Sequence, residues 1–261
     1  MSTSPSVGTT TGVTDASVPA ASSAAMGDRR HNADWYRQID HWIFDLDNTL
    51  YPRSSNLFDQ IDHLISSYVA DLLELEPIEA QRVQKAYYRK YGTTLRGLIE
   101  EHGIEPDDFL DKVHDIDYAP VQPDPQLTEA IHKLPGRKYI LTNGTTAHAR
   151  RVTDRLGITE VFDLFFDITS GKLIPKPAEV TYGRFLHESG VDPKRAVMFE
   201  DLARNLLVPD ALGMATVLVH PSQDTEHHAY PWELEGADEP YVHHRTQDLG
   251  AFLTDIVAHL E

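Results

Sequence analysis

The sequence predicts an α/β fold: a parallel sheet covered by helices, with an all-helical insertion after the first strand. Three observations predict this fold. An apolar strand pattern at His41–Phe44 is followed by a helical block without strand patterns, over about residues 54–120. Beyond the block, strand and helix patterns alternate to the end of the chain, which is typical of parallel sheets. Because one strand precedes the block, the block is an insertion into the sheet-forming part of the chain.

The chain divides into three parts on this basis. Residues 1–33 are rich in Ser, Thr, Ala and Gly without a hydrophobic period, so we expect a disordered tail. Residues 34–53 and 121–261 are expected to form a core domain with a Rossmann-like parallel sheet. Residues 54–120 are expected to form a helical cap domain.

The helical block carries the start and stop signals of four helices. Apolar residues recur every three or four positions from Leu57 onward. Pro77 is expected to begin a second helix that Gly92 ends, because proline suits a first helical turn and glycine a C-terminus. A third helix is expected over about residues 94–103, and a fourth after Pro106.

The remaining elements alternate after a proline-rich exit from the block. Short apolar runs predict strands, and periodic runs closed by glycine predict helices. The strands are expected at residues 138–141, 164–168, 196–199 and 216–219. The helices are expected at residues 147–156, 179–188, 203–212 and 247–260.

Composition narrows the function classes. The chain has 261 residues, 41 acidic against 23 basic, and a net charge of −18. Such a surface disfavours nucleic acid and anionic membranes as partners, and an anionic small substrate would need a bound cation and a well-placed lysine. Cysteine is absent, which excludes thiol chemistry and leaves oxygen or imidazole ligands for any metal. No apolar run reaches the roughly 20 residues that span a bilayer and no secretory signal is evident, so we expect a cytoplasmic protein.

Asp45 and Asp47 follow the first predicted strand. Residues two apart on an extended chain point the same way, so these carboxylates repel each other unless a cation or a shared proton intervenes. Both arrangements suit phosphoryl transfer, in which one Asp attacks phosphorus and the other protonates the leaving oxygen. The structural alternative is an ordinary Asp–Asn turn at the end of a strand.

Three later residues are candidates for binding phosphate. Thr142 offers a hydroxyl, and Asn143 lies on a loop that enters a helix, where backbone N–H groups can hold phosphate oxygens. Lys176 lies between two prolines that stiffen the backbone, which favours it over Lys172 as a lysine that reaches inward. The alternatives are a helix cap at residues 142–143 and a solvated lysine in a proline-rich loop.

Glu200 and Asp201 follow another apolar strand. Adjacent acids beside a buried strand are unusual without a nearby cation, and Mg²⁺ prefers oxygen ligands. We expect Asp201 to contact the metal, with Glu200 as a possible further ligand. The alternative is an Asp that caps the following helix.

In this order, the four segments resemble the motifs of the haloacid dehalogenase (HAD) superfamily of phosphohydrolases, over about residues 39–259. The resemblance implies the HAD fold, with a helical cap inserted after the first motif. It implies that Asp45 is the nucleophile and Asp47 the general acid and base. Phosphate would be held by Thr142, Asn143 and Lys176. Mg²⁺ would be bound by Asp45, the main-chain carbonyl of Asp47, and Asp201.

Within that superfamily the chain is most similar to the pyrimidine 5′-nucleotidase-like branch. The similarity lies in residues 47–52, 91–98, 114–118 and 242–244. It implies that Tyr91 and Arg96 of the cap select the substrate, although helix packing is an alternative role for the cap tyrosines. Residues 202–205 depart from the pattern, because relatives often carry a second Asp or a Ser there.

The expected function is hydrolysis of a small phosphorylated substrate, a pyrimidine nucleoside 5′-monophosphate. A sugar-phosphate or broad-specificity phosphatase, or a phosphomutase, is the alternative on the same fold. A non-catalytic nucleotide- or metabolite-binding protein is the alternative of another class, and the filled reactive positions disfavour it. A haloacid dehalogenase would not need Asp47 as an acid. The sequence makes no prediction of oligomeric state.

Overall fold

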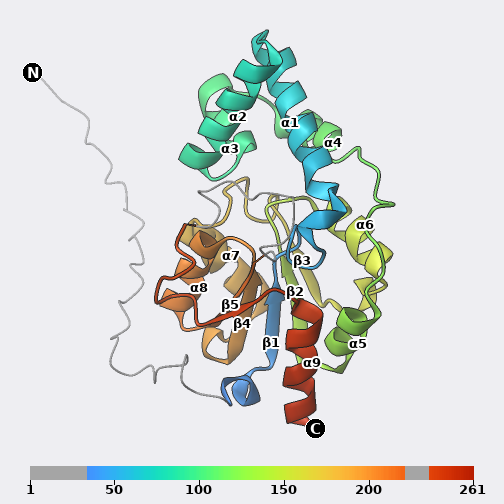
Figure 1. Ribbon diagram of the computed structural model, residues 1–261. Coiled ribbons are helices and arrows are strands. Elements are labelled where there is room, and N and C mark those ends of the chain that lie inside the picture. Colours follow the sequence, from blue (N-terminus) through green and yellow to red (C-terminus); the bar gives the residue numbers. More distant parts are fainter. Residues whose placement is uncertain (1–33, 221–234) are drawn as a thin grey trace, which may run out of the picture.

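The computed structural model describes residues 34–220 and 235–261, so the expected tail, residues 1–33, lies outside the described residues. The described residues form a six-stranded parallel sheet in the order β3-β2-β1-β4-β5-β6 (Figure 1). The predicted α/β fold is therefore confirmed. The strands are β1 (His41–Phe44), β2 (Arg137–Leu141), β3 (Leu164–Phe166), β4 (Ala196–Glu200), β5 (Ala215–Val219) and β6 (His244–Thr246).

Helices cover both faces of the sheet. On one face lie α5, α6 and α9, and on the other α7 and α8 (Figure 1). Side chains alternate along β1, so Trp42 and Phe44 join the first apolar core and Ile43 the second. The bounds are α5 (Pro125–Lys133), α6 (Thr146–Leu156), α7 (Glu179–Ser189), α8 (Leu207–Leu212) and α9 (Leu249–Leu260).

The cap helices lie beyond the carboxyl ends of the strands and share an apolar core of their own (Figure 1). Its members include Ile61, Leu98 and Phe109, and Ile168 joins them from the segment after β3. Gly92 and Gly103 have positive φ angles at the ends of their helices, a conformation that glycine adopts without steric cost. The four helices are α1 (Leu57–Leu73), α2 (Pro77–Tyr91), α3 (Thr94–His102) and α4 (Pro106–Val113).

Three elements differ from the sequence-based prediction. Strand β6 was not predicted, because His244–Thr246 contains no apolar run. Helix α5 lies in a segment where only the proline-rich exit was expected; the Asp124 side chain caps it by accepting a hydrogen bond from Leu127 N. The helix expected at residues 203–212 is divided, because Pro209 cannot donate a backbone hydrogen bond and is tolerated only near a helix start. The short 3₁₀ helices are η2 (Trp35–Gln38), η3 (Arg53–Ser55), η4 (Thr159–Val161), η5 (Pro193–Arg195) and η6 (Ala203–Leu206).

The strand order reverses at β1, which pairs with β2 on one side and β4 on the other. In parallel sheets, ligands bind beyond the carboxyl ends of the strands at such a point. Phe44 of β1 is in register with Phe199 of β4, so Asp45 and Glu200 emerge next to each other. None of the described helices combines the length and apolar character that crossing a bilayer requires.

Candidate active site

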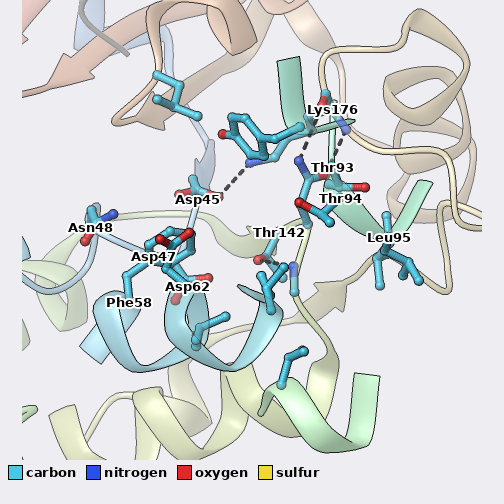
Figure 2. Close-up of a pocket in the computed structure, with 18 of the residues that line it drawn as sticks. Asp45, Asp47, Asn48, Phe58, Asp62, Thr93, Thr94, Leu95, Thr142 and Lys176 are labelled. Atoms are coloured by element: carbon cyan, nitrogen blue, oxygen red, sulfur yellow. Dashed lines mark hydrogen bonds and ion pairs between the residues drawn. The ribbon is translucent and has the colours of Figure 1, made fainter. Parts of the chain in front are cut away.

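A cavity of about 140 Å³ lies between the carboxyl ends of the central strands and the cap helices (Figure 2). Its core side is polar, whereas much of its cap side is apolar, so it suits a small molecule with one charged and one apolar end. The polar side includes Asp45, Asp47, Thr142, Lys176, Glu200 and Asp201. The apolar side includes Phe58, Ile61, Ile65, Leu95, Phe109, Leu110 and Val113.

Lys176 lies at the centre of the polar side. Its side chain is 1% exposed, and Nζ donates to Asp45 Oδ1 at 2.7 Å and to Glu200 Oε1 at 2.6 Å. Burial opposes its charge, but the two carboxylates outweigh burial and raise the pKa of Lys176. Lys176 is therefore a permanent cation in contact with Asp45.

The main chain of Lys176 is fixed by Asn143. Asn143 Oδ1 accepts a hydrogen bond from Lys176 N at 2.8 Å, and Asn143 Nδ2 donates to Lys176 O at 3.3 Å. The Asn143 side chain thus positions the lysine, which leaves one amide N–H and the backbone for the phosphate contact expected from sequence. Thr142 is buried, and its Oγ1 accepts from Gly144 N at 2.9 Å, so the hydroxyl proton is available for another acceptor.

Asp45 is held from several sides at the end of β1. Its N–H donates to Phe199 O at 2.9 Å, and Oδ2 accepts from Thr49 Oγ1 at 3.2 Å. Burial raises the pKa of Asp45 to about 7, against the opposing effect of Lys176. Two buried carboxylates, Asp45 and Glu200, share this one ammonium group, so carboxylates outnumber the cations that contact them here.

Glu200 has both carboxylate oxygens occupied. Oε1 accepts from Lys176 and from Asn205 Nδ2 at 2.7 Å, and Oε2 accepts from Leu202 N at 2.9 Å. Its side chain is fully buried. These bonds hold Glu200 against Lys176 and leave fewer of its lone pairs for a metal ion.

Carboxylate oxygens of Asp45, Glu200 and Asp201 lie within 4.8 Å of one another. Such a hard, anionic oxygen set suits Mg²⁺, and a divalent cation would correct the charge imbalance around Asp45. Glu200 accepts three hydrogen bonds and Asp45 two, and Asp201 is partly exposed, so Asp45 and Asp201 are the better placed ligands. Arg53 Nη2 lies 3.4 Å from Asp201 Oδ2.

Asp47 is bound on one oxygen by two donors. Asp47 Oδ1 accepts from Tyr51 Oη at 2.5 Å and lies 2.8 Å from His148 Nε2. Burial alone would raise the pKa of Asp47, but the interactions with His148 and Tyr51 outweigh it and lower the pKa. The sequence motifs pointed to Asp47 but not to the histidine that holds it.

The structure brings most of the sequence-predicted residues together. Asp45, Asp47, Thr142 and Lys176 face one space in Figure 2, and Asn143, Glu200 and Asp201 also line the cavity. The two cap residues do not. Tyr91 hydrogen-bonds Glu101 and Arg96 pairs with Glu100, on a separate hollow at the outer side of the Lys176 loop.

The cap side of the cavity is instead lined by Thr93, Thr94 and Leu95, which Figure 2 labels. Helix α3 starts at Thr94, so these residues face the core while Arg96, one position further, points elsewhere. Tyr91 and Arg96, which the sequence-based expectation placed at the substrate, therefore do not line the cavity, although their neighbours at residues 93–95 do.

Arg53 and His148 were missed by sequence reasoning. Arg53 follows Asp47 by six positions, and His148 lies in the first turn of the helix that follows Thr142. Proximity to a motif was the available signal, but it does not tell which side chains turn toward the site.

A model of the haloacid dehalogenase-like hydrolase family matches residues 39–208, which is more than half of the chain. The chain belongs to this family. The matched range includes all four motif segments, the cap, and β1 to β4. The protein is thus a HAD-like hydrolase.

Among curated proteins, this HAD-like hydrolase is similar to Phosphate metabolism protein 8 of Saccharomyces cerevisiae. The two are 33% identical over 134 residues, or 47% of this chain and 41% of the yeast protein. The matched region therefore spans less than half of the yeast protein's length.

Solved structures share the fold at low sequence identity. A HAD phosphatase from Thermococcus onnurineus matches with a TM-score of 0.55 and 15% identity, over 84% of this chain and 98% of that one. L-2-haloacid dehalogenase from Xanthobacter autotrophicus matches with a TM-score of 0.51 and 17% identity, over the same shares. The magnesium-bound putative HAD-hydrolase YfnB from Bacillus subtilis has a TM-score of 0.51 and 14% identity, over 85% and 99%. At these identities the likeness concerns the fold alone.

Proposed function

We propose that this HAD-like hydrolase is a Mg²⁺-dependent phosphomonoester hydrolase that forms an aspartyl-phosphate on Asp45. One observation supports the proposal most: two carboxylates at the end of β1 have different partners. Asp45 contacts the Lys176 ammonium group, whereas Asp47 is held by His148 and Tyr51. These surroundings suit a nucleophile and a separate proton carrier.

In the first step, a carboxylate oxygen of Asp45 attacks phosphorus. The bond between phosphorus and the ester oxygen breaks, and its electron pair stays on the leaving oxygen, which takes a proton from Asp47. Lys176 and the hydroxyl of Thr142 would hold phosphate oxygens and stabilise the charge that develops on them.

In the second step, water attacks phosphorus of the aspartyl-phosphate. Asp47 accepts the proton of that water, and the bond between phosphorus and Asp45 breaks. Free phosphate leaves, and both carboxyl groups return to their starting states. The cap would limit access of bulk water to the intermediate.

Asp45, Asp201 and the main-chain carbonyl of Asp47 would hold Mg²⁺. When bound, the metal would offset the negative charge of the phosphate and of the surrounding carboxylates. Lys176 would remain beside Asp45, supported by Glu200.

The proposed substrate is a small phosphate monoester of the pyrimidine nucleoside 5′-monophosphate class. The apolar cap side of the cavity suits the flat face of a base, and Thr93 and Thr94 could bind its polar edge. The similarity to a yeast phosphate metabolism protein supports phosphate chemistry in general. A haloacid dehalogenase is less well supported, because carbon–halogen cleavage needs no proton donor at Asp47.

The test is phosphate release from UMP, CMP, AMP and a hexose phosphate, with Mg²⁺ and with EDTA. We expect Mg²⁺-dependent release, fastest from UMP or CMP, and a fall of more than about 10³-fold in kcat for Asp45→Asn. Asp255→Asn, an exposed change on α9, is the matched control. Unchanged release by Asp45→Asn would refute the nucleophile, and no release from any ester would support a binding protein.

A further inference from the structure

His148 is a fully buried histidine whose two ring nitrogens both have partners. Nε2 lies 2.8 Å from Asp47 Oδ1, and Nδ1 lies 3.0 Å from Tyr118 Oη. The residue sits in the first turn of α6, where its own N–H donates to the Thr145 side chain at 3.2 Å. Backbone and ring are thus both fixed.

The partners determine the donor and acceptor roles of the two ring nitrogens. Asp47 Oδ1 also accepts from Tyr51, and the acid form of Asp47 carries its proton on Oδ2, so His148 Nε2 donates to Oδ1. The Tyr118 hydroxyl has one proton and two acceptors nearby, the His114 main-chain oxygen at 3.3 Å and His148 Nδ1 at 3.0 Å, and we assign the proton to the shorter contact. Tyr118 therefore orients the donor that Asp47 needs, as a carboxylate orients the histidine of a hydrolase triad.

The bonds on Asp47 leave its second oxygen for chemistry. Tyr51 and His148 both bind Oδ1, so neither occupies Oδ2. The carboxyl group also lines the cavity next to Asp45. A carboxyl group fixed through one oxygen can present the other at a constant position to a leaving oxygen.

The same histidine contacts the segment that returns from the cap to the core. The His114 ring stacks on the His148 ring with 4.7 Å between centroids, and Tyr118 follows four residues later. His114 is itself anchored to the end of α4 through Nδ1, which is 2.8 Å from Leu110 O. The environment of Asp47 therefore depends on how the last cap helix meets the core.

We propose that His148, oriented by Tyr118, is a positioning residue that holds Asp47 for proton transfer to the leaving oxygen. The inference rests on the proposed function, because it assigns a role within that reaction. If the inference holds, changing His148 should slow hydrolysis most for substrates whose leaving group needs a proton.

Leaving-group chemistry separates this role from a general structural one. The 5′-oxygen of a nucleotide leaves as a strongly basic alkoxide unless it is protonated, whereas p-nitrophenolate is stable without a proton. Loss of the positioned acid should therefore lower kcat/KM for the nucleotide far more than for p-nitrophenyl phosphate. The kcat/KM value reports steps up to formation of the aspartyl-phosphate, so the second step does not obscure the comparison.

The experiment measures kcat/KM of His148→Phe, His148→Gln and Tyr118→Phe with UMP and with p-nitrophenyl phosphate. We expect His148→Phe to lose about 10²-fold or more with UMP and less than about tenfold with the aryl ester. Glutamine can donate from a position close to Nε2, so His148→Gln should recover much of the loss. Tyr118→Phe should lose about two- to tenfold with UMP, since it removes one hydrogen bond.

His132→Gln, an exposed change on α5, is the matched control and should leave both substrates unaffected. Equal losses with both substrates in folded His148→Gln and Tyr118→Phe proteins would overturn the inference. Should His148→Phe fail to fold, those two variants still decide the question. Asp47→Asn separates the two proposals. If this variant loses the same activity with both substrates, the proposed acid role of Asp47 fails. If Asp47→Asn loses far more with UMP but the His148 variants do not, only the inference about His148 fails.

Discussion

Lys176 Nζ lies 2.7 Å from Asp45 Oδ1 and also serves Glu200, so two buried carboxylates share one ammonium group. This arrangement holds Asp45 at the end of β1 but leaves an excess of negative charge around it. We therefore expect the site to favour a divalent cation and to destabilise the protein when no cation is bound.

The first prediction concerns the stability of Asp45→Asn without metal. The folded protein retains the Asp45 proton up to about pH 7, whereas the unfolded chain releases it near the ordinary value of 3.8. The wild type therefore loses stability as the pH rises between these values. We expect Asp45→Asn in EDTA to exceed the wild-type free energy of unfolding by about 2 kcal/mol at pH 8, and by little at pH 4.

Urea unfolding at both pH values checks this expectation, with Asp255→Asn as the control. Saturating Mg²⁺ should stabilise the wild type more than Asp45→Asn and so remove the difference. A variant that is less stable than the wild type at pH 8 in EDTA would contradict the charge imbalance.

The second prediction separates Asp201 from Glu200 as metal ligands. Asp201→Asn should raise the Mg²⁺ concentration for half-maximal activity by at least about tenfold, because it removes a direct anionic ligand. Glu200→Gln should change that concentration by much less, because the Glu200 oxygens accept from Lys176, Asn205 and Leu202. A Mg²⁺ titration of activity and of the thermal unfolding midpoint measures both. Equal effects of the two changes would show that Glu200 binds metal directly.

The third prediction concerns acid sensitivity at His114. Burial lowers the pKa of His114 to about 4 from its ordinary 6.5, and the neighbouring His148 acts in the same direction. As the pH falls from about 6.5 toward 4, the unfolded chain binds a proton at His114 before the folded protein does. The free energy of unfolding therefore decreases over this range. The wild type should therefore lose stability over this range relative to His114→Phe, which keeps the ring stacking.

Chemical denaturation at steps between pH 7 and pH 4 tests this difference. His187→Phe, at an exposed position on α7, is the control and should follow the wild type. A constant stability difference between His114→Phe and the wild type across the range would exclude a buried neutral His114.

The fourth prediction concerns packing between α2 and α3. A Cβ atom at Gly97 would lie 2.6 Å from Cβ and Cγ of Tyr87, so Gly97→Ala must push the helices apart. We expect a loss of about 1–3 kcal/mol in the free energy of unfolding. Gly183→Ala on α7 is the matched control, because nothing lies within 4 Å of its added Cβ. That control should gain up to about 1 kcal/mol from helix propensity, and a neutral Gly97→Ala would contradict the close approach.

Most of the fold could be predicted because its signals are local. Pro77 and Gly92 bound α2 through their own backbone preferences, and β1 could be recognised from the run of three apolar residues that follows His41. Helix α5 was not predicted, although Asp124 and Pro125 are ordinary start signals, because clustered prolines also mark loops. The divided helix at residues 203–212 shows the same ambiguity around Pro209.

The sequence by itself determined the chemical groups of the site. Asp45 and Thr142 directly follow a strand, and Glu200 ends one. Asp47 comes two residues after Asp45, and parallel strands bring such ends to one edge of the sheet. Their convergence follows from strand position alone, without knowledge of any side-chain contact. Lys176 was chosen over Lys172 from its flanking prolines, again a local property.

Only the tertiary structure decided the partners of those groups. His148 and Asp47 are 101 residues apart and meet because β1 and β2 are neighbours and α6 packs on one face of the sheet. Arg96 faces Glu100 and not the cavity because the rotation of α3 about its axis is set by packing of the cap core. Contacts between distant segments depend on strand order and helix rotation, which no local pattern encodes.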